Sequence, residues 1–195
     1  MVHTINVNKM NWKKLSSEYI ARFQYFTARK DRCEMPDGKI VESYYVVELP
    51  RSACALAITE EGDVILTKQY RHPIEKTIVE LPGGFVEEDE DIIKGIAREL
   101  LEETGYEFAQ IELLGKVAAN PGILNNYTDL FLATGGKKVA KQSLDANEEI
   151  EIILLPLEAV RGMLHRNEFD QALHVSCMLY AFRKLDEDND AMNFY

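Results

Sequence analysis

The sequence predicts a mixed α/β domain that follows a small antiparallel sheet or hairpin. Segments rich in Val, Ile, Thr, Tyr and Phe alternate along the chain with segments whose apolar residues recur at helical spacing, which is typical of a mixed α/β fold. Several strand-like segments are joined in pairs by short turns that contain Gly or Pro. The length of 195 residues suits one domain with a small appendage.

The N-terminal part predicts two strands joined by a tight turn. Residues 22–33 and 40–49 are rich in aromatic and β-branched side chains. Between them, Pro36-Asp37-Gly38 supplies a fixed φ and a glycine that tolerates positive φ, as a turn requires. The expected division of the chain is a β extension at 1–50, a main domain at 51–185 and an acidic tail at 186–195.

The main domain predicts strands in hairpins, interleaved with helices. The strands are expected at 53–59, 64–70, 77–80, 111–118, 128–133 and 150–155, and the helices at 89–104, 157–165 and 171–185. In the first helix, Ile93, Ile96 and Leu100 keep one face apolar. Gly105 stands where a glycine commonly ends a helix.

The composition narrows the classes of function. The formal net charge is -11, from 22 basic and 33 acidic residues, so nonspecific binding to nucleic acid is disfavoured. No apolar run reaches the ~20 residues that cross a bilayer, and the N-terminus lacks the pattern of a signal peptide. The three cysteines form no C-x-x-C pair, which favours reduced thiols in a cytoplasmic protein.

An acidic cluster on the first helix is a candidate metal site. Glu99 lies three and four residues before Glu102 and Glu103, so the three carboxylates share one side of the helix. They lie in its C-terminal half, where the helix dipole disfavours anions. Hard oxygen ligands suit Mg²⁺ or Mn²⁺, whereas a solvated acidic face is the alternative.

The segment from Gly84 to Tyr106 resembles the Nudix hydrolase signature, G-x5-E-x7-R-E-U-x-E-E-x-G-U, where U is a bulky apolar residue. Every fixed position is filled at the right spacing, by Gly84, Glu90, Arg98, Glu99, Leu100, Glu102, Glu103, Gly105 and Tyr106. The resemblance implies an α/β/α sandwich with a mixed sheet. It also implies hydrolysis of a nucleoside diphosphate that is linked to a further group.

The same resemblance implies roles for residues of the segment. The implied metal ligands are the carboxylates of Glu99, Glu102 and Glu103 and the backbone carbonyl of Gly83. Glu99 and Glu103 are the principal ones, and they take part in catalysis with Mg²⁺ or, as an alternative, Mn²⁺. Glu90 and Arg98 are expected to form an ion pair that fixes the loop to the helix.

Other residues resemble the ADP-ribose pyrophosphatase branch of this family. Pro121 stands 16 residues after Gly105, as in that branch, although a loop proline would also stand there. By the same resemblance, Arg71 is expected to contact substrate and Glu80 to lie by the terminal ribose. The N-terminal extension resembles the branch's added sheet, which implies a homodimer with residues 20–49 at the interface. Pro82-Gly83-Gly84 departs from the usual Pro-Ala-Gly.

A loop acid after the signature is the remaining candidate. In the branch, an acid on such a loop serves as base or as a further metal ligand, and Glu148 follows Asn147 as in the branch's Asn-Glu pair. Glu148 is therefore the expected metal-linked catalytic acid. Ala146 fills the position where some members carry the base, so Asp145 or Glu149 are alternatives for that role.

The predicted function is Mg²⁺-dependent hydrolysis of a nucleotide sugar, with ADP-ribose cleaved to AMP and ribose 5-phosphate. The alternatives are a Nudix hydrolase of another sugar nucleotide or of a dinucleotide, and a Nudix domain that senses a nucleotide sugar without catalysis. The intact acids of the signature favour the enzyme. No nucleic acid or membrane partner is expected.

Overall fold

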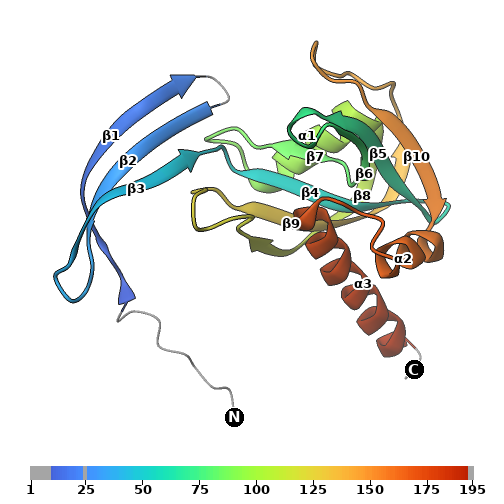
Figure 1. Cartoon of the computed structure of the whole chain (residues 1–195). Helices are drawn as coiled ribbons and strands as arrows, with labels where there is room; N and C mark the ends of the chain where they lie inside the picture. The colour runs from blue at the N-terminus through green and yellow to red at the C-terminus, as the bar shows by residue number, and fades with distance from the viewer. Residues whose placement is uncertain (1–9, 24–25, 193–195) are drawn as a thin grey trace. The chain divides into compact units, whose positions relative to one another are not determined.

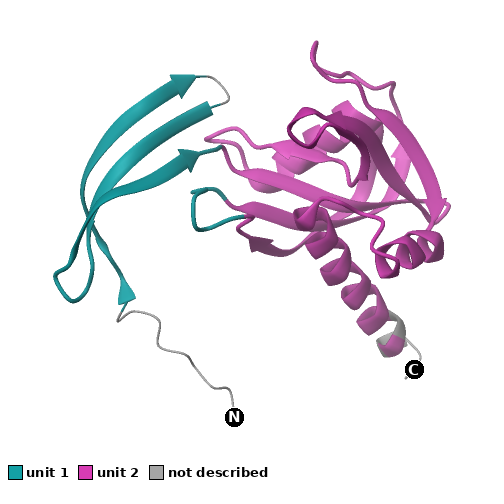
Figure 2. Cartoon of the chain, viewed as in Figure 1, with its two compact units in different colours: residues 1–49, 120–126 teal, residues 50–119, 127–195 magenta. Residues whose placement is uncertain are grey.

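The chain folds into two compact units. A computed structural model describes residues 10–23 and 26–192. Unit 1 comprises residues 1–49 together with 120–126, and unit 2 comprises residues 50–119 and 127–195 (Figures 1 and 2). The first boundary lies beside the expected one at residue 50. The inclusion of 120–126 in unit 1 was not predicted, because no local signal shows that a distant loop joins this sheet.

Unit 1 is a three-stranded antiparallel sheet in the order β1-β2-β3. Its strands are β1 (Lys13–Phe23), β2 (Phe26–Glu34) and β3 (Ile40–Glu48). The expected turn joins β2 to β3, with Gly38 at φ 85° donating its N–H to Met35 O over 2.9 Å. Strand β1 was missed, because it mixes charged and apolar residues without a clear alternation. The loop 120–126 adds to β3, where Val47 N–H donates to Ile123 O over 2.8 Å.

Unit 2 is built on a seven-stranded mixed sheet. Its strands are β4 (Ser52–Thr59), β5 (Asp63–Arg71), β6 (Lys76–Glu80), β7 (Gly83–Phe85), β8 (Tyr106–Val117), β9 (Thr128–Lys138) and β10 (Glu151–Pro156). The main path runs β10-β5-β4-β9-β8, with β6 paired to β5 and β7 paired to β4. Only β4 and β9 pair in parallel among the described ladders.

Helices cover both faces of this sheet. They are α1 (Ile92–Thr104), α2 (Leu157–His165) and α3 (Ala172–Met192), with a short 3₁₀ turn, η2 (His72–Ile74), after β5. Helix α3 continues through the acidic residues 186–190, which we expected to form a tail. None of the helices within the described residues is long and apolar enough to cross a membrane.

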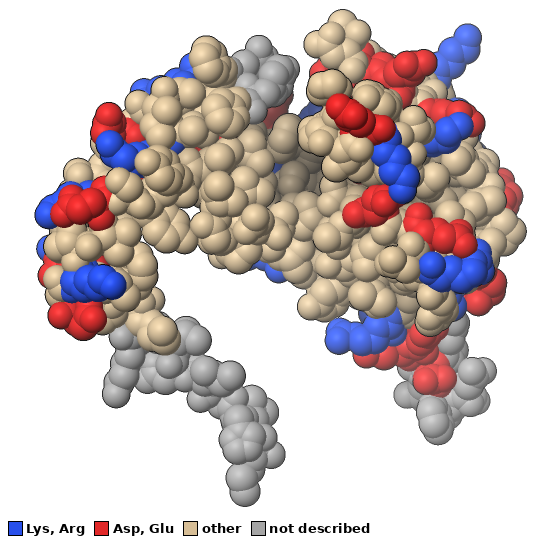
Figure 3. Space-filling view, viewed as in Figure 1, with Lys and Arg blue, Asp and Glu red and all other residues tan. Residues whose placement is uncertain are grey.

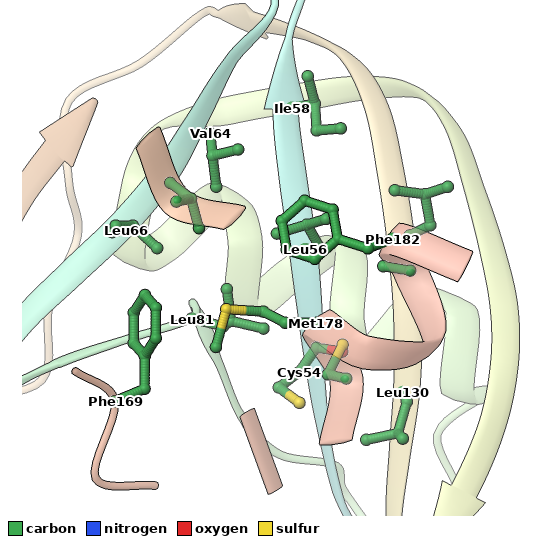
Figure 4. Packing of buried hydrophobic residues seen from close by; sticks show 14 residues of the cluster. Cys54, Leu56, Ile58, Val64, Leu66, Leu81, Leu130, Phe169, Met178 and Phe182 are labelled. Atoms are coloured by element: carbon green, nitrogen blue, oxygen red, sulfur yellow. The ribbon is translucent and has the colours of Figure 1, made fainter. Parts of the chain in front are cut away.

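Two hydrophobic clusters form the inner layers of unit 2, one on each face of the sheet. Along β4, Ala53, Ala55 and Ala57 pack on the α1 side, while Cys54, Leu56 and Ile58 pack on the α3 side. This strict alternation follows from the strand period of two. Figure 4 shows the α3 side, where Met178 and Phe182 lie against Leu56. The α/β/α sandwich that the resemblance implied is confirmed.

Local signals set both ends of α1. The Asp91 carboxylate accepts hydrogen bonds from the backbone N–H groups of Ile93 and Lys94, as an N-cap does. Gly105 ends the helix at φ 73°, in the left-handed region that favours glycine, and its N–H donates to Leu101 O. The predicted helix end is therefore confirmed. The helix begins at Ile92, three residues after the expected start at residue 89.

Candidate active site

Strand β7 brings backbone atoms against the acidic helix. Gly83 pairs with Cys54 on β4, and its φ is 146°. A Cβ atom at this position would lie 2.2 Å from Ala53 O, which is far inside van der Waals contact. The Gly83 position therefore requires glycine in this backbone, and the strand lies closer to β4 than any side chain would allow.

The lack of a side chain at Gly84 leaves room for the carboxylate of Glu99. A Cβ atom on Gly84 would lie 2.4 Å from Glu99 Oε2. The carboxylate of Glu99 thus rests against the bare backbone of β7, and its side chain is 15% exposed. The first glycine of the signature has a direct structural reason, because any side chain there would displace this acid.

Glu103 is the most deeply buried acid of the helix. It is 8% exposed, and its Oε2 accepts the N–H of Gly83 over 2.8 Å. Burial raises the pKa of Glu103 to about 8, with a further increase from the negative charges of Glu99 and Glu148. The Gly83 N–H and the positive charge of Arg71 oppose this rise in pKa. The structure thus holds a carboxyl group whose negative charge is poorly compensated.

Arg98 binds the other acids of the signature. Its guanidinium donates to Glu90 through Nε and Nη2, each over 3.0 Å. Its Nη1 donates to Glu99 over 2.8 Å and to Glu102 over 2.9 Å. The Glu90–Arg98 ion pair that the sequence predicts is therefore present in the structure. The same arginine also neutralises part of the acidic cluster through Glu99 and Glu102.

Glu148 lies within electrostatic reach of the helix acids. Burial raises the pKa of Glu99, the Arg98 charge opposes this, and the negative charges of Glu102 and Glu148 add to it. Within its own loop, Glu148 Oε2 accepts the backbone N–H of Asp145 over 3.1 Å. The charge of Glu148 thus acts on Glu99 and Glu103 of the helix from a loop that is distant in the sequence. The two alternative acids, Asp145 and Glu149, are solvent-exposed.

Arg71 and Glu80 form a partly buried ion pair at the β5–β6 hairpin. Arg71 Nε donates to Glu80 Oε2 over 2.7 Å, and the side chains are 43% and 1% exposed. His174 on α3 lies behind them, with Nδ1 accepting the N–H of Leu81 over 3.1 Å. Burial, helped by the Arg71 charge, lowers the pKa of His174 to about 3, so the ring is neutral. Because Glu80 is buried, its ion pair with Arg71 orients the half-exposed guanidinium.

The acids fit a hard divalent cation. Carboxylate oxygens beside a backbone strand are the donor set that Mg²⁺ and Mn²⁺ prefer. A cation near Glu99 and Glu103 would offset the burial and the acidic repulsion that together raise the pKa of both carboxylates. Within residues 10–23 and 26–192, no three His, Cys, Asp or Glu side chains already stand as a ligand group. Glu99 and Glu103 instead bond to Arg98 and to the Gly83 amide.

Two further positions are Pro121, which was expected at the site, and His174, whose contact was not expected. Pro121 belongs to unit 1, in the segment that bonds to β3. His174 carries no motif, and it lies behind the Arg71–Glu80 pair with Nδ1 accepting the N–H of Leu81. No spacing could indicate its place, because Leu81 is 93 residues away in the sequence.

Comparisons with known proteins agree with the site. The model of the NUDIX domain matches residues 48–175, and that of the nucleoside diphosphate sugar hydrolase N-terminal domain matches residues 12–47. The chain is 35% identical over 160 residues to the methanol dehydrogenase activator of Bacillus methanolicus, covering 81% of this chain and 86% of that protein. It is 32% identical over 162 residues to the ADP-ribose pyrophosphatase of Bacillus subtilis strain 168, covering 80% and 87%.

A solved structure shares the whole fold. The crystal structure of an ADP compounds hydrolase superposes with a TM-score of 0.79 at 20% identity, covering 95% of this chain and 98% of that chain. At this identity the likeness speaks for the fold alone. The signature residues, their convergence beside β7 and a domain match over more than half of the chain together lead to one conclusion: the chain belongs to the Nudix family.

Proposed function

We propose that this chain hydrolyses the diphosphate of a nucleoside diphosphate sugar, and that ADP-ribose, cleaved to AMP and ribose 5-phosphate, is its main substrate. The observation that carries the proposal is the placement of Glu99 and Glu103 against the backbone of β7, where the charges of Glu148 and Arg71 also act on Glu103. The N-terminal domain match and the names of the relatives support the substrate class.

The acids would hold Mg²⁺, with Mn²⁺ as an alternative. Glu99 and Glu103 are the principal ligands in this proposal, and the further ligands are Glu102, Glu148 and the carbonyl of Gly83. Bound there, the metal supplies charge neutralisation for the diphosphate and lowers the pKa of a bound water. Glu99 and Glu103 would take part in catalysis by fixing that position next to β7. Arg98 holds Glu99 and Glu102 in the structure described here and would share them with the metal.

Arg71 would hold the substrate. Its Nε is committed to Glu80, which leaves the two terminal amino groups of a half-exposed guanidinium to meet a phosphate oxygen. Glu80 is 1% exposed and would fix the direction of this arginine. In this way Glu80 would contribute to substrate binding near the ribose by holding Arg71 in place, and the Glu80 side chain itself would not need to move far. Pro121 would contribute from its loop, as the resemblance to the branch implies.

The division of labour along the chain is also proposed. Residues 51–185 would form the catalytic domain, and residues 1–50 would pair two copies of the chain into a homodimer. Unit 1 exposes large apolar side chains, namely Met10 and Trp12 before β1 and Leu15, Tyr19, Ile20, Phe23, Phe26 and Tyr45 on its strands. Exposed apolar surface of this kind is typical of a protein interface. Residues 186–188 are exposed on α3, and residues 193–195 of the expected tail lie outside the described part of the chain.

A substrate panel tests the function. Purified protein is assayed with Mg²⁺ and with Mn²⁺ on ADP-ribose, other sugar nucleotides, a dinucleotide such as NAD⁺ and nucleoside triphosphates, with product identified by chromatography. We expect ADP-ribose to have the highest kcat/KM and AMP to be a product. Glu103→Gln should abolish most of the turnover, whereas Glu107→Gln, on the exposed edge of β8, should not.

Each other result of the panel has a meaning. A higher kcat/KM on a different sugar nucleotide or on the dinucleotide would replace ADP-ribose by that substrate class. Tight binding of ADP-ribose without any turnover, measured by calorimetry, would instead indicate a sensing domain. A preference for triphosphates would reject the proposed class.

A further inference from the structure

The loop that carries Glu148 is fastened to the end of α1 by backbone bonds. Residues 139–150 connect β9 to β10 and are mostly solvent-exposed. At the start of the loop, the N–H groups of Val139 and Ala140 donate to Gly105 O. The N–H of Ser143 donates to Glu102 O over 2.8 Å. The loop thus begins on the carbonyl groups that a helix C-terminus leaves without partners inside the helix.

The side chain of Gln142 ties both ends of this loop together. Its Nε2 donates to the backbone carbonyl of Glu103 over 2.8 Å and to that of Ile150 over 3.1 Å. A primary amide has two N–H donors, so both are used here. Glu103 O belongs to the last turn of α1, and Ile150, which is 8% exposed, stands directly before β10. Gln142 therefore links the helix that carries Glu103 to the end of the loop, directly before β10.

Glu148 lies two residues before that link. The N–H of Glu148 donates to Asp145 O over 3.0 Å, which makes a turn within the closed loop. Because the Gln142 amide bonds to both Glu103 O and Ile150 O, the end of the loop that carries Glu148 is held at the last turn of α1. The position of Glu148 relative to Glu103 is thus set through Gln142, which bonds to the backbone of Glu103 itself.

We propose that Gln142 is a positioning residue that holds Glu148 at the metal-binding acids. This inference rests on the proposed function, because it assigns Gln142 a role toward Glu148 in the same site. Gln142 acts through the two carbonyl groups that it joins. A supporting residue of this kind typically changes metal affinity or activity by about 10- to 100-fold when it is replaced.

Variants of Gln142 separate its donors from its shape. Gln142→Met has a similar length without a donor, and Gln142→Lys keeps N–H donors on a long chain. Gln110→Met, on an exposed glutamine of β8, is the matched control. We expect Gln142→Met to weaken Mn²⁺ binding, measured by titration calorimetry, by about 10-fold or more. Gln142→Lys should restore part of the affinity, and the control should match the wild type.

A double-mutant cycle with Glu148→Gln provides the decisive comparison. If Gln142 acts through Glu148, then Gln142→Met should weaken Mn²⁺ binding in the wild-type background and change it less than about 2-fold in the Glu148→Gln background. Hydrogen exchange of metal-free protein should also become faster in residues 143–149 of Gln142→Met and remain unchanged in Gln110→Met. A merely structural helix cap would lower the melting temperature equally in both backgrounds without this coupling.

The results distinguish the two proposals. Equal Mn²⁺ affinity in Gln142→Met and Gln110→Met, or losses that simply multiply in the double mutant, would overturn the role of Gln142 whatever the enzyme does. Absence of turnover in the wild type on the whole substrate panel would overturn the proposed function. In that event the Mn²⁺ cycle would still decide whether Gln142 positions Glu148.

Discussion

The backbone N–H of Gly83 donates to the carboxylate of Glu103, although the two residues stand 20 positions apart in the sequence. This bond joins β7 to α1 at the centre of the acidic cluster. It favours the ionised form of a carboxyl group whose burial otherwise raises its pKa to about 8. A single amide does not offset the loss of water around the charge, which is why the site favours a cation.

The first prediction concerns catalysis by Glu103. We expect Glu103→Gln to lower kcat by about 100-fold or more, because it removes a charged ligand at the centre of the cluster and weakens both metal binding and water activation. The fold should persist, since the amide can still accept the Gly83 N–H. Steady-state kinetics at saturating Mg²⁺ and a circular dichroism spectrum check both points. Wild-type turnover in this variant would contradict the metal site.

The second prediction is a pH dependence of stability in metal-free protein. The pKa of Glu103 is about 8 in the folded state against an ordinary value of 4.5. Between these values the folded protein keeps a proton that the unfolded chain releases, so the free energy of unfolding falls as the pH rises through this window. Below pH 4.5 both states are protonated, and the full stability is present.

Glu103→Gln removes this titration. In EDTA, its melting temperature should equal that of the wild type below about pH 4.5 and exceed it increasingly as the pH approaches about 8 to 9. Glu107→Gln, on an exposed side chain, is the control and should show no such trend. A constant difference between Glu103→Gln and wild type across this range would show that the Glu103 carboxyl does not titrate there.

The third prediction concerns the Arg98 network. Arg98→Lys keeps the positive charge, but an ammonium group cannot bond to Glu90, Glu99 and Glu102 in the geometry of a guanidinium. We expect a loss of about 1–3 kcal/mol in the free energy of unfolding in EDTA, measured with urea, since the lost bonds are to charged groups. Arg183 forms an exposed ion pair with Glu187 on α3. Arg183→Lys should change the free energy of unfolding by less than about 0.5 kcal/mol.

The fold of unit 2 was largely predictable because its signals are local. The Asp91 cap, the apolar spacing and Gly105 define α1 within one segment of chain. Strand β7 was not predictable, because Gly83 and Gly84 suggest a turn, and the strand exists only through its pairing with β4. Local sequence likewise gives no sign that the loop 120–126 completes the sheet of unit 1.

The candidate site could be predicted from the sequence within the continuous signature. The prediction was incomplete for residues that only the packing of the sheet brings together. Arg71 and Glu80 were each expected near substrate, but no spacing indicates their ion pair, because the β5–β6 register places Arg71 opposite Lys76 and Glu80 opposite Thr67. Gln142 and His174 carry no motif, and their contacts arise only after distant elements have packed. Sequence reasoning therefore indicated the acids and Arg98, and it missed the contacts that Gln142 and His174 make across the fold.

The fourth prediction concerns the dimer. Phe23 and Phe26 are cross-strand partners in unit 1 and are 71% and 49% exposed. Burial of such side chains stabilises an interface by about 1.5–3 kcal/mol each. We expect light scattering to give about twice the chain mass of 22.3 kDa for the wild type, and a mixture shifted to single chains when both are replaced by Lys. Leu179→Lys, equally exposed on α3, should stay dimeric. A mass of one chain for the wild type at micromolar concentration would reject the dimer.

The last prediction tests the loop acid. Glu148 is solvent-exposed on the loop that Gln142 ties to the end of α1, and its negative charge adds to the rise in the pKa of Glu99 and Glu103. We expect Glu148→Gln to slow turnover on the best substrate by about 10- to 1,000-fold and to change KM less, because its contribution grows toward the transition state. Asp145→Asn and Glu149→Gln keep the loop and should have milder effects. If all three variants, assayed separately, retain wild-type kcat, this loop takes no part in the chemistry. A loss confined to Asp145→Asn or Glu149→Gln would instead move the role of base to that residue.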